Sequence, residues 1–425
     1  MRRMLPVTGP IEMQRAAIKQ ATAALERARV GDERFDQMGD VEVGQTPNDV
    51  VYRENKLQLR HYPAEREETR EIPIVIVYAL INRPYILDLQ PNRSVVRALT
   101  SQGFDVYLID WGEPSRLDAS LTLEDYVVRY IDNCVSAVQE DAGVSRVHLL
   151  GYCMGGTMSV MYAALFPERV RTLGLMAAGL CFDDTGGVLE RWGDEAHFSP
   201  EHVIETYGNV PAEFLDIGFQ LMDPVANLVG KYARLYDNLT DEEFVENFAR
   251  MERWLADGID VAGETYREFI EEIYQDNALY RNDLTLGDRE VRLENITMPV
   301  LQIVGEYDHL IPPESSTPLN DVLPSEDVSV IQQATGHIGL SVSSGSHEEL
   351  WPAVAAWYAE REGPGPASLL ERIRGIGPVY ADRLVDAGIE SPEELASTPV
   401  EELARAADVS PGRAANWVDR VEEID

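Results

Sequence analysis

Residues 147–164 read VHLLGYCMGGTMSVMYAA, and this stretch decides the fold. An apolar run ends at Gly151, and small and apolar residues typical of a buried helix follow Cys153. Glycines two positions before and two positions after Cys153 permit a sharp turn from strand to helix. Such a turn exposes the thiol at the helix N-terminus, where the helix dipole and free N–H groups favour the thiolate. The stretch therefore predicts a nucleophile elbow with Cys153 as the nucleophile.

Apolar segments on both sides of the elbow have the length and composition of buried strands. They lie at residues 74–77, 106–109, 147–150, 173–176, 300–304 and 328–331, and short strands are also expected at 50–52 and 57–62. Helical periodicity appears at residues 94–101, 123–139 and 157–165, and an amphipathic helix is expected at about 10–30. Alternation of buried strands with helices predicts a doubly wound α/β architecture around a mostly parallel sheet.

An elbow nucleophile needs an acid and then a histidine later in the chain. Asp308 follows the strand in MPVLQIVGEYDHLIPP, and His337 follows the next strand in VSVIQQATGHIGLSV. We expect His337 to take the proton of the thiol and Asp308 to orient the imidazole ring. Glu306 is the alternative acid. His309 and His347 are alternative bases, but neither lies just past the last strand, where the base is expected.

The segment that follows residues 74–77 should pass beside the elbow. The backbone N–H of Ala79 or Leu80, together with that of Met154, is therefore a candidate oxyanion hole. Ordinary strand-to-loop sequence is the alternative interpretation. His148 lies within the strand before the elbow and is expected in the core.

Two regions depart from the alternating pattern. Residues from about 181 to 290 are helical and rich in aromatic side chains, which predicts a cap over the sheet or, alternatively, extra helices packed on one side. The run GPGPAS at 363–368 predicts a flexible linker. It would separate a catalytic domain at residues 1–362 from a small all-α domain at residues 369–425.

The small domain contains the turn Arg374-Gly375-Ile376-Gly377-Pro378 between apolar helices, which resembles a helix-hairpin-helix module. Such modules often bind DNA through backbone N–H groups near phosphate. From residue 361 to the end, however, there are 14 acidic side chains, 7 arginines and no lysine. Because a basic footprint is missing, packing against the enzyme or itself, or binding of another protein, is favoured over DNA binding.

The charge of the chain indicates its environment. Acidic residues number 74 against 36 basic ones, the net charge is -38, and only Lys19, Lys56 and Lys231 are lysines. This charge repels itself in dilute buffer but keeps a protein hydrated where concentrated salt screens it. The composition favours a halophilic protein and opposes nucleic-acid backbones as partners. An ordinary acidic protein is the alternative, and it leaves the scarcity of lysine unexplained.

The cysteines and the N-terminal sequence indicate the cellular compartment. Cys134, Cys153 and Cys181 lack the paired spacing of a disulfide framework or a zinc site, so free thiols are expected. No ligand cluster or phosphate-binding glycine loop appears, and neither a metal nor an organic cofactor is expected. The N-terminus has no apolar stretch like that of a signal peptide, and no run reaches the roughly 18 residues of a membrane span. We expect a cytoplasmic protein.

The motifs VYALINRPYILDLQPNRSVVRALTSQGFDVYLIDWG, GYCMGG, GEYDHLIPP and GHIGLSVS resemble those of the polyhydroxyalkanoate synthases, specifically the class III catalytic subunit. The resemblance covers about residues 1–362 and implies an α/β-hydrolase fold with Cys153, Asp308 and His337 as the catalytic triad. It also implies an acyltransferase that polymerises short-chain (R)-3-hydroxyacyl-CoA, such as 3-hydroxybutyryl-CoA, through a covalent Cys153 thioester. Coenzyme A would enter only as part of the substrate.

The same resemblance implies partners and a location. The expected partners are a growing polyester chain, a second and smaller synthase subunit, and granule-surface proteins. The expected location is on storage granules in the cytoplasm, and the expected state is a homo- or hetero-oligomer. The tail from residue 369 departs from the family pattern. A cysteine-dependent thioester or lactone hydrolase of the same fold is the nearest alternative function, and a non-catalytic scaffold that coats granules is another.

The charge generates a first prediction. Lowering the salt from molar to about 0.1 M lengthens the Debye screening length from about 3 Å to about 10 Å, which strengthens repulsion among the excess acids. We expect the protein to unfold or to lose activity over this range. Circular dichroism and turnover across a salt series measure it, and full structure with full activity at low salt would refute the halophilic interpretation.

Overall fold

The computed structural model describes residues 30, 34, 38, 39, 41–66, 69–222, 230–362 and 366–421. Apart from residue 30, the helix expected at residues 10–30 lies outside the described residues. The chain divides into two compact units, Met1–Ala356 and Trp357–Asp425. The linker expected at residues 363–368 is described only from residue 366 onward.

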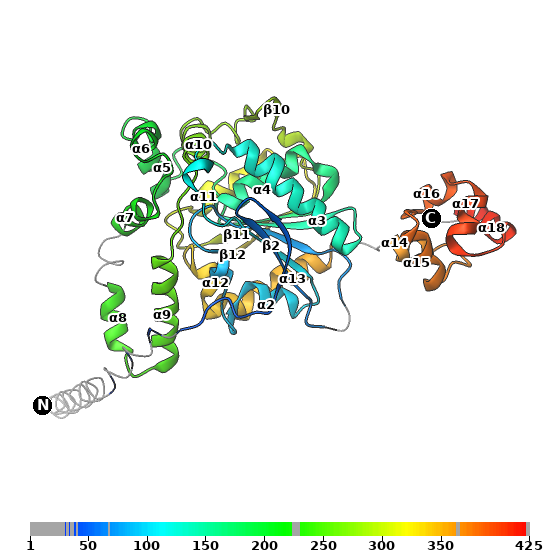
Figure 1. Cartoon of the computed structure of the whole chain (residues 1–425), viewed down its shortest axis with the longest axis horizontal. Coiled ribbons are helices and arrows are strands. Elements are labelled where there is room, and N and C mark those ends of the chain that lie inside the picture. Colours follow the sequence, from blue (N-terminus) through cyan, green and yellow to red (C-terminus); the bar gives the residue numbers. More distant parts are fainter. Residues whose placement is uncertain are drawn as a thin grey trace, which may run out of the picture. The chain divides into compact units, whose positions relative to one another are not determined.

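An eight-stranded sheet forms the centre of the first unit (Figure 1). In spatial order its strands are β1 (Asp49–Glu54), β2 (Leu57–Tyr62), β6 (Val106–Asp110), β3 (Ile74–Val77), β7 (Val147–Tyr152), β8 (Val170–Met176), β11 (Val300–Gly305) and β12 (Val328–Gln333). The pairs from β6 to β12 are parallel, whereas β2 is antiparallel to both β1 and β6. Each strand predicted from the sequence is confirmed.

Helices cover both faces of this sheet. In Figure 1, α3 (Asp132–Ala142) and α4 (Met154–Leu165) lie on one face, and α2 (Val95–Thr100) lies on the other. Every residue of β3, β7 and β11 is buried, which explains why their sequences are apolar except at His148 and Gln302. His148 of β7 is also buried, its Nδ1 lies 2.8 Å from the Thr172 hydroxyl, and burial lowers its pKa to about 3. It is a core residue, as predicted.

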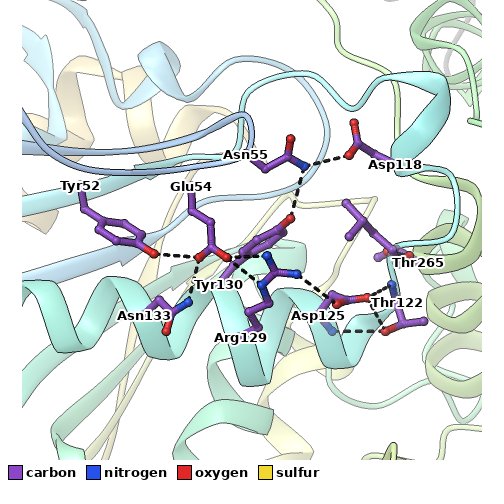
Figure 2. A network of polar contacts seen from close by, with 11 residues as sticks. Tyr52, Glu54, Asn55, Asp118, Thr122, Asp125, Arg129, Tyr130, Asn133 and Thr265 are labelled. Atoms are coloured by element: carbon purple, nitrogen blue, oxygen red, sulfur yellow. Dashed lines mark hydrogen bonds and ion pairs between the residues drawn. The ribbon is translucent and has the colours of Figure 1, made fainter.

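A polar network fastens the antiparallel edge of the sheet (Figure 2). The Glu54 carboxylate at the end of β1 accepts hydrogen bonds from the Tyr52 hydroxyl (2.8 Å), Asn133 Nδ2 (2.8 Å) and Arg129 Nε (2.7 Å). Arg129 belongs to η3 (Asp125–Ile131), a π-helical segment that continues directly into α3. The network ties β1 to the helix that covers this edge.

Helices also fill the segment between β8 and β11. They are α5 (Val188–Gly193), α6 (Pro200–Tyr207), α7 (Ala212–Met222), α8 (Lys231–Asp237), α9 (Glu242–Ala256), α10 (Gly263–Glu268) and the π-helical η6 (Phe269–Gln275). We call the described residues 188–222 and 230–275 the cap. Buried Val203, Val210, Val261, Tyr266 and Ile270 form an apolar cluster within it. The aromatic-rich helical sequence therefore packs around this cluster, against which Ile81 from the segment after β3 also packs.

The second unit is helical in its described part. It contains α14 (Pro366–Glu371), α15 (Pro378–Asp386), α16 (Pro392–Ser397), α17 (Val400–Ala407) and α18 (Pro411–Val421). Leu370, Ile373, Leu384, Leu403 and Trp417 are among the residues of its buried core. The turn between α14 and α15 passes through Gly375, whose φ of +105° favours glycine. This is the hairpin that the sequence predicted.

The turn from β7 to α4 is the sharp elbow expected around Cys153. Cys153 has φ 55° and ψ −123°, a backbone conformation that is rare outside glycine. A Cβ atom on Gly151 would lie 2.4 Å from the Cα of Gly156, and one on Gly155 would lie 2.0 Å from the Val77 carbonyl oxygen. Strand and helix thus approach too closely for any side chain at the two glycines.

A second prediction follows from this packing. Gly155→Ala should reduce the free energy of unfolding by about 3 kcal/mol or more, because the new methyl group overlaps backbone that cannot move aside. The matched control is Gly218→Ala in α7, where a Cβ meets nothing within 4 Å. That change should stabilise the protein by about 0.5 to 1 kcal/mol. Denaturant unfolding in molar salt measures both, and wild-type stability for the Gly155 variant would contradict the packing argument.

Candidate active site

Three side chains meet at the C-terminal edge of the sheet. Cys153 follows β7, Asp308 follows β11 and His337 follows β12. His337 Nδ1 lies 2.7 Å from Asp308 Oδ2, and the Cys153 side chain is a hydrogen-bonding neighbour of the same imidazole ring. The structure therefore brings together the three residues that the sequence selected as a nucleophile, an acid and a base.

The turn after β11 fixes the Asp308 carboxylate. Its Oδ1 accepts hydrogen bonds from the backbone N–H groups of Leu310 (2.9 Å) and Ile311 (3.0 Å), which leaves Oδ2 for His337. The Asp308 side chain has no exposed surface and that of His337 is 8% exposed. A buried carboxylate with this many partners holds one orientation.

The alternative acid and bases lie elsewhere. Glu306 and His309 are exposed on the surface. His347 belongs to η9 (Ser346–Leu350), where its Nε2 lies 2.8 Å from the Ser341 carbonyl oxygen. Among these five residues, only Asp308 and His337 contact each other beside the thiol.

Electrostatics favours the charged form of the His337 ring. Burial alone would lower the pKa of His337, but the charge of Asp308, the Cys153 sulfur and the hydrogen bonds that the ring makes with both raise this pKa well above its ordinary value. The imidazolium therefore persists to higher pH than in a free histidine. A cationic ring is therefore held beside the Cys153 side chain.

The three cysteines are free but differ in their surroundings. Cys153 is partly exposed, whereas Cys134 and Cys181 are buried. Burial raises the pKa of both of these thiols. Buried thiols with raised pKa values are inert, so Cys153 is the thiol suited to nucleophilic attack.

The segment after β3 passes directly beside the elbow. A Cβ atom on Gly155 would lie 2.0 Å from the Val77 carbonyl oxygen and 2.6 Å from that of Tyr78, so the end of β3 touches the first turn of α4. Ala79, Leu80 and Met154 are buried near this contact. The assignment of their backbone N–H groups as donors to the oxyanion stays a prediction.

Aromatic side chains around the triad were missed in the sequence. Tyr152 packs on His337 with ring centroids 5.4 Å apart, and Tyr78 lies on Tyr152 at 5.7 Å. On the cap side, Phe182 is in ring contact with Tyr274 of η6, with centroids 4.5 Å apart, and burial together with the nearby Cys153 sulfur raises the pKa of Tyr274 well above its usual value. The one available signal was the place of Tyr152 beside the nucleophile, but its partners come from distant segments.

No group of three or more His, Cys, Asp or Glu side chains in the described ranges could hold a metal ion. Of the helices in the part of the chain that the structure covers, none combines the length and apolar character that crossing a membrane requires.

Comparison with known protein families gives three matches along the chain. A family described as the alpha/beta hydrolase fold matches residues 72–342. The N-terminus of poly-beta-hydroxybutyrate polymerase (PhaC) matches residues 9–99, and a SAM-like helix-hairpin-helix tandem matches residues 367–423. The first match agrees with the observed sheet and elbow.

Individual relatives are similar over most of their length. The poly(3-hydroxyalkanoate) polymerase subunit PhaC of Haloferax mediterranei is 53% identical, over 99% of each chain. That of Haloarcula marismortui is 53% identical over 98% of each chain, and both come from halophilic archaea. The PhaC subunit of a Synechocystis species is 43% identical and matches 76% of this chain and 87% of its own. The resemblance noted in the sequence is confirmed: the chain belongs to the family of poly(3-hydroxyalkanoate) polymerase subunits PhaC, which are acyltransferases.

Proposed function

We propose that this chain polymerises short-chain (R)-3-hydroxyacyl-CoA thioesters, such as 3-hydroxybutyryl-CoA, into polyhydroxyalkanoate with release of coenzyme A. The observation that carries the proposal is the partly exposed Cys153 beside the His337–Asp308 pair, whose 2.7 Å contact is buried. This arrangement occurs in a chain whose relatives are named as polymerases of 3-hydroxyalkanoates.

The first half of the reaction forms an acyl enzyme. His337 takes the proton of Cys153, and the thiolate attacks the carbonyl carbon of the thioester. The negative oxygen is stabilised by the backbone N–H of Met154 with that of Ala79 or Leu80. The carbon–sulfur bond to coenzyme A then breaks, and the departing thiolate takes the proton from His337.

The second half transfers the acyl group to oxygen. His337 accepts the proton of an incoming 3-hydroxyl group, and the oxygen attacks the acyl thioester on Cys153. An ester bond forms, the bond to sulfur breaks, and His337 passes its proton to the departing Cys153 sulfur, so the cysteine is free again. Cysteine suits this cycle because the first step exchanges one thioester for another, whereas the second converts a reactive thioester into a more stable ester.

Competition with water decides between polymerase and hydrolase. Both would use the same triad, but a hydrolase would release free acid. The burial of Asp308 and His337 and the aromatic pair Phe182–Tyr274 near Cys153 support the polymerase, because a water-poor site protects the acyl enzyme. Measuring coenzyme A release together with the chain length of the product separates the two functions. Coenzyme A release with only free acid as product would establish the hydrolase.

Partners and location are further parts of the proposal. We expect a second, smaller synthase subunit, granule-surface proteins and an oligomeric assembly on cytoplasmic polyester granules. The relatives are named as polymerase subunits, which supports a multi-subunit enzyme. The acidic second unit suits contact with proteins rather than with nucleic acid.

A third prediction concerns the nucleophile. Cys153→Ala should lower both coenzyme A release and polymer formation by at least about a thousandfold, because no other side chain takes over the covalent step. Cys134→Ala and Cys181→Ala are matched controls that remove buried thiols and should retain most activity. Kinetics on folded variants decide the matter, and normal turnover by the Cys153 variant would eliminate the mechanism.

A fourth prediction separates the two halves of the reaction. His337→Gln should be nearly inactive, because it removes the base from both steps. Asp308→Asn should retain acylation better than elongation, since a thiol ionises more easily than a hydroxyl, and elongation should fall by about a hundredfold or more. Single-turnover acylation with labelled hydroxybutyryl-CoA and steady-state elongation provide the two rates. An equal loss in both steps for the Asp308 variant would contradict this division of roles.

A further inference from the structure

We infer that Tyr152 is a positioning residue that acts through His337, with its ring stacked on the face of the imidazole to fix the plane of the ring and favour the imidazolium. The inference rests on the proposed function, in which His337 is the base. It assigns a role to a residue that neither the motif nor the chemistry of the triad requires.

The geometry separates the contribution of Tyr152 from that of Asp308. Asp308 contacts the edge of the imidazole, at Nδ1, whereas Tyr152 covers a face, with ring centroids 5.4 Å apart and planes inclined by 29°. Contacts at the edge of the imidazole still allow some tilting of the ring about its Cβ–Cγ bond. A flat side chain against the face opposes that rotation, so the two contacts together define one ring orientation.

Tyr152 is itself held firmly. It is the last residue of β7, it is 2% exposed, and its backbone pairs with β8 at Met176. The ring of Tyr78 lies at 5.7 Å from the Tyr152 ring. The Tyr152 hydroxyl is near that of Ser341, in the short helix α12 (Gly339–Val342) that follows His337. A side chain fixed by a central strand is a rigid surface against which a loop histidine can be placed.

The stacking also has an electrostatic consequence. The face of a phenol ring carries negative potential and attracts a cation, more strongly where water is excluded. Among the described residues, the titratable groups that contact the His337 ring are Asp308, Cys153 and Tyr152. Burial raises the pKa of Tyr152 well above its usual value, so its ring stays neutral and acts through its face. Tyr152 therefore adds to the stabilisation of the imidazolium by Asp308.

The test is the titration of His337 in the full chain without substrate. Histidine-labelled protein is followed by NMR in molar salt, and His337→Gln assigns the signal among the seven histidines. Tyr152→Leu and Tyr152→Met remove the aromatic face, and we expect each to lower the pKa of His337 by about one unit, a roughly tenfold change in the protonation equilibrium. Tyr152→Phe keeps the face and should leave this pKa at the wild-type value.

Tyr126→Leu is the matched control. Tyr126 is a buried tyrosine whose ring contacts are Trp111 and Tyr130, so its loss reports a general loosening of the core. The inference is overturned if the Leu and Met variants titrate like the wild type, if Tyr152→Phe lowers the pKa of His337 as much as they do, or if Tyr126→Leu does the same.

If Tyr152→Leu and Tyr152→Met do not fold, phenylalanine at position 152 is compared with its ring-fluorinated analogue, which keeps the shape but weakens the negative face. An unchanged His337 pKa in that pair would equally overturn the inference.

A pH profile of acylation gives a second readout. Since the imidazolium is part of the reactive pair, its loss sets the alkaline limb of kcat/KM. A lower pKa of His337 moves that limb to lower pH in Tyr152→Leu and Tyr152→Met, and an unmoved limb in both counts against the inference.

The outcomes also separate the two proposals. If the wild-type chain makes polymer and the Tyr152 variants keep the wild-type pKa of His337, only the role of Tyr152 is refuted. If the variants lower this pKa but the wild-type chain makes no polymer, only the proposed function is refuted.

Discussion

The close approach of α4 to the end of β3 is the constraint on which the rest of the site depends. Because Gly155 has no side chain, the first turn of the helix rests on the Val77 carbonyl group. This contact forces the sharp turn at Cys153, presents the thiol at the helix N-terminus and brings the backbone after β3 alongside. One pair of glycines thereby positions the nucleophile and the segment expected to stabilise the oxyanion.

The remaining parts supply charge and exclude water. Asp308 is anchored by two backbone N–H groups and gives its free oxygen to His337, so a buried negative charge is compensated on both sides. Tyr152 closes the face of the imidazole, and aromatic residues near the cap approach Cys153. A thioester held in such surroundings is protected from hydrolysis until a hydroxyl group reaches it, which is the condition for polymer growth.

The parts of this site that depend on local sequence could be predicted. The strands follow from apolar runs, the elbow from two glycines around Cys153, and the places of Asp308 and His337 from the strands that precede them. The row Tyr78–Tyr152–His337 could not be predicted, because three strands distant in sequence bring these rings together. The π-helical segments Asp125–Ile131 and Phe269–Gln275 were also missed, since their sequences have ordinary helical periodicity and differ only in backbone hydrogen bonding.

Capture of the covalent acyl enzyme tests the mechanism most directly. The chain is mixed with isotopically labelled 3-hydroxybutyryl-CoA in molar salt and quenched in acid within one turnover, and its peptides are mapped by mass spectrometry. The mechanism predicts a 3-hydroxybutyryl adduct on the peptide that contains Cys153, sensitive to neutral hydroxylamine as a thioester is. An adduct on a different side chain, or polymer formed with no adduct on Cys153 at any quench time, would contradict it.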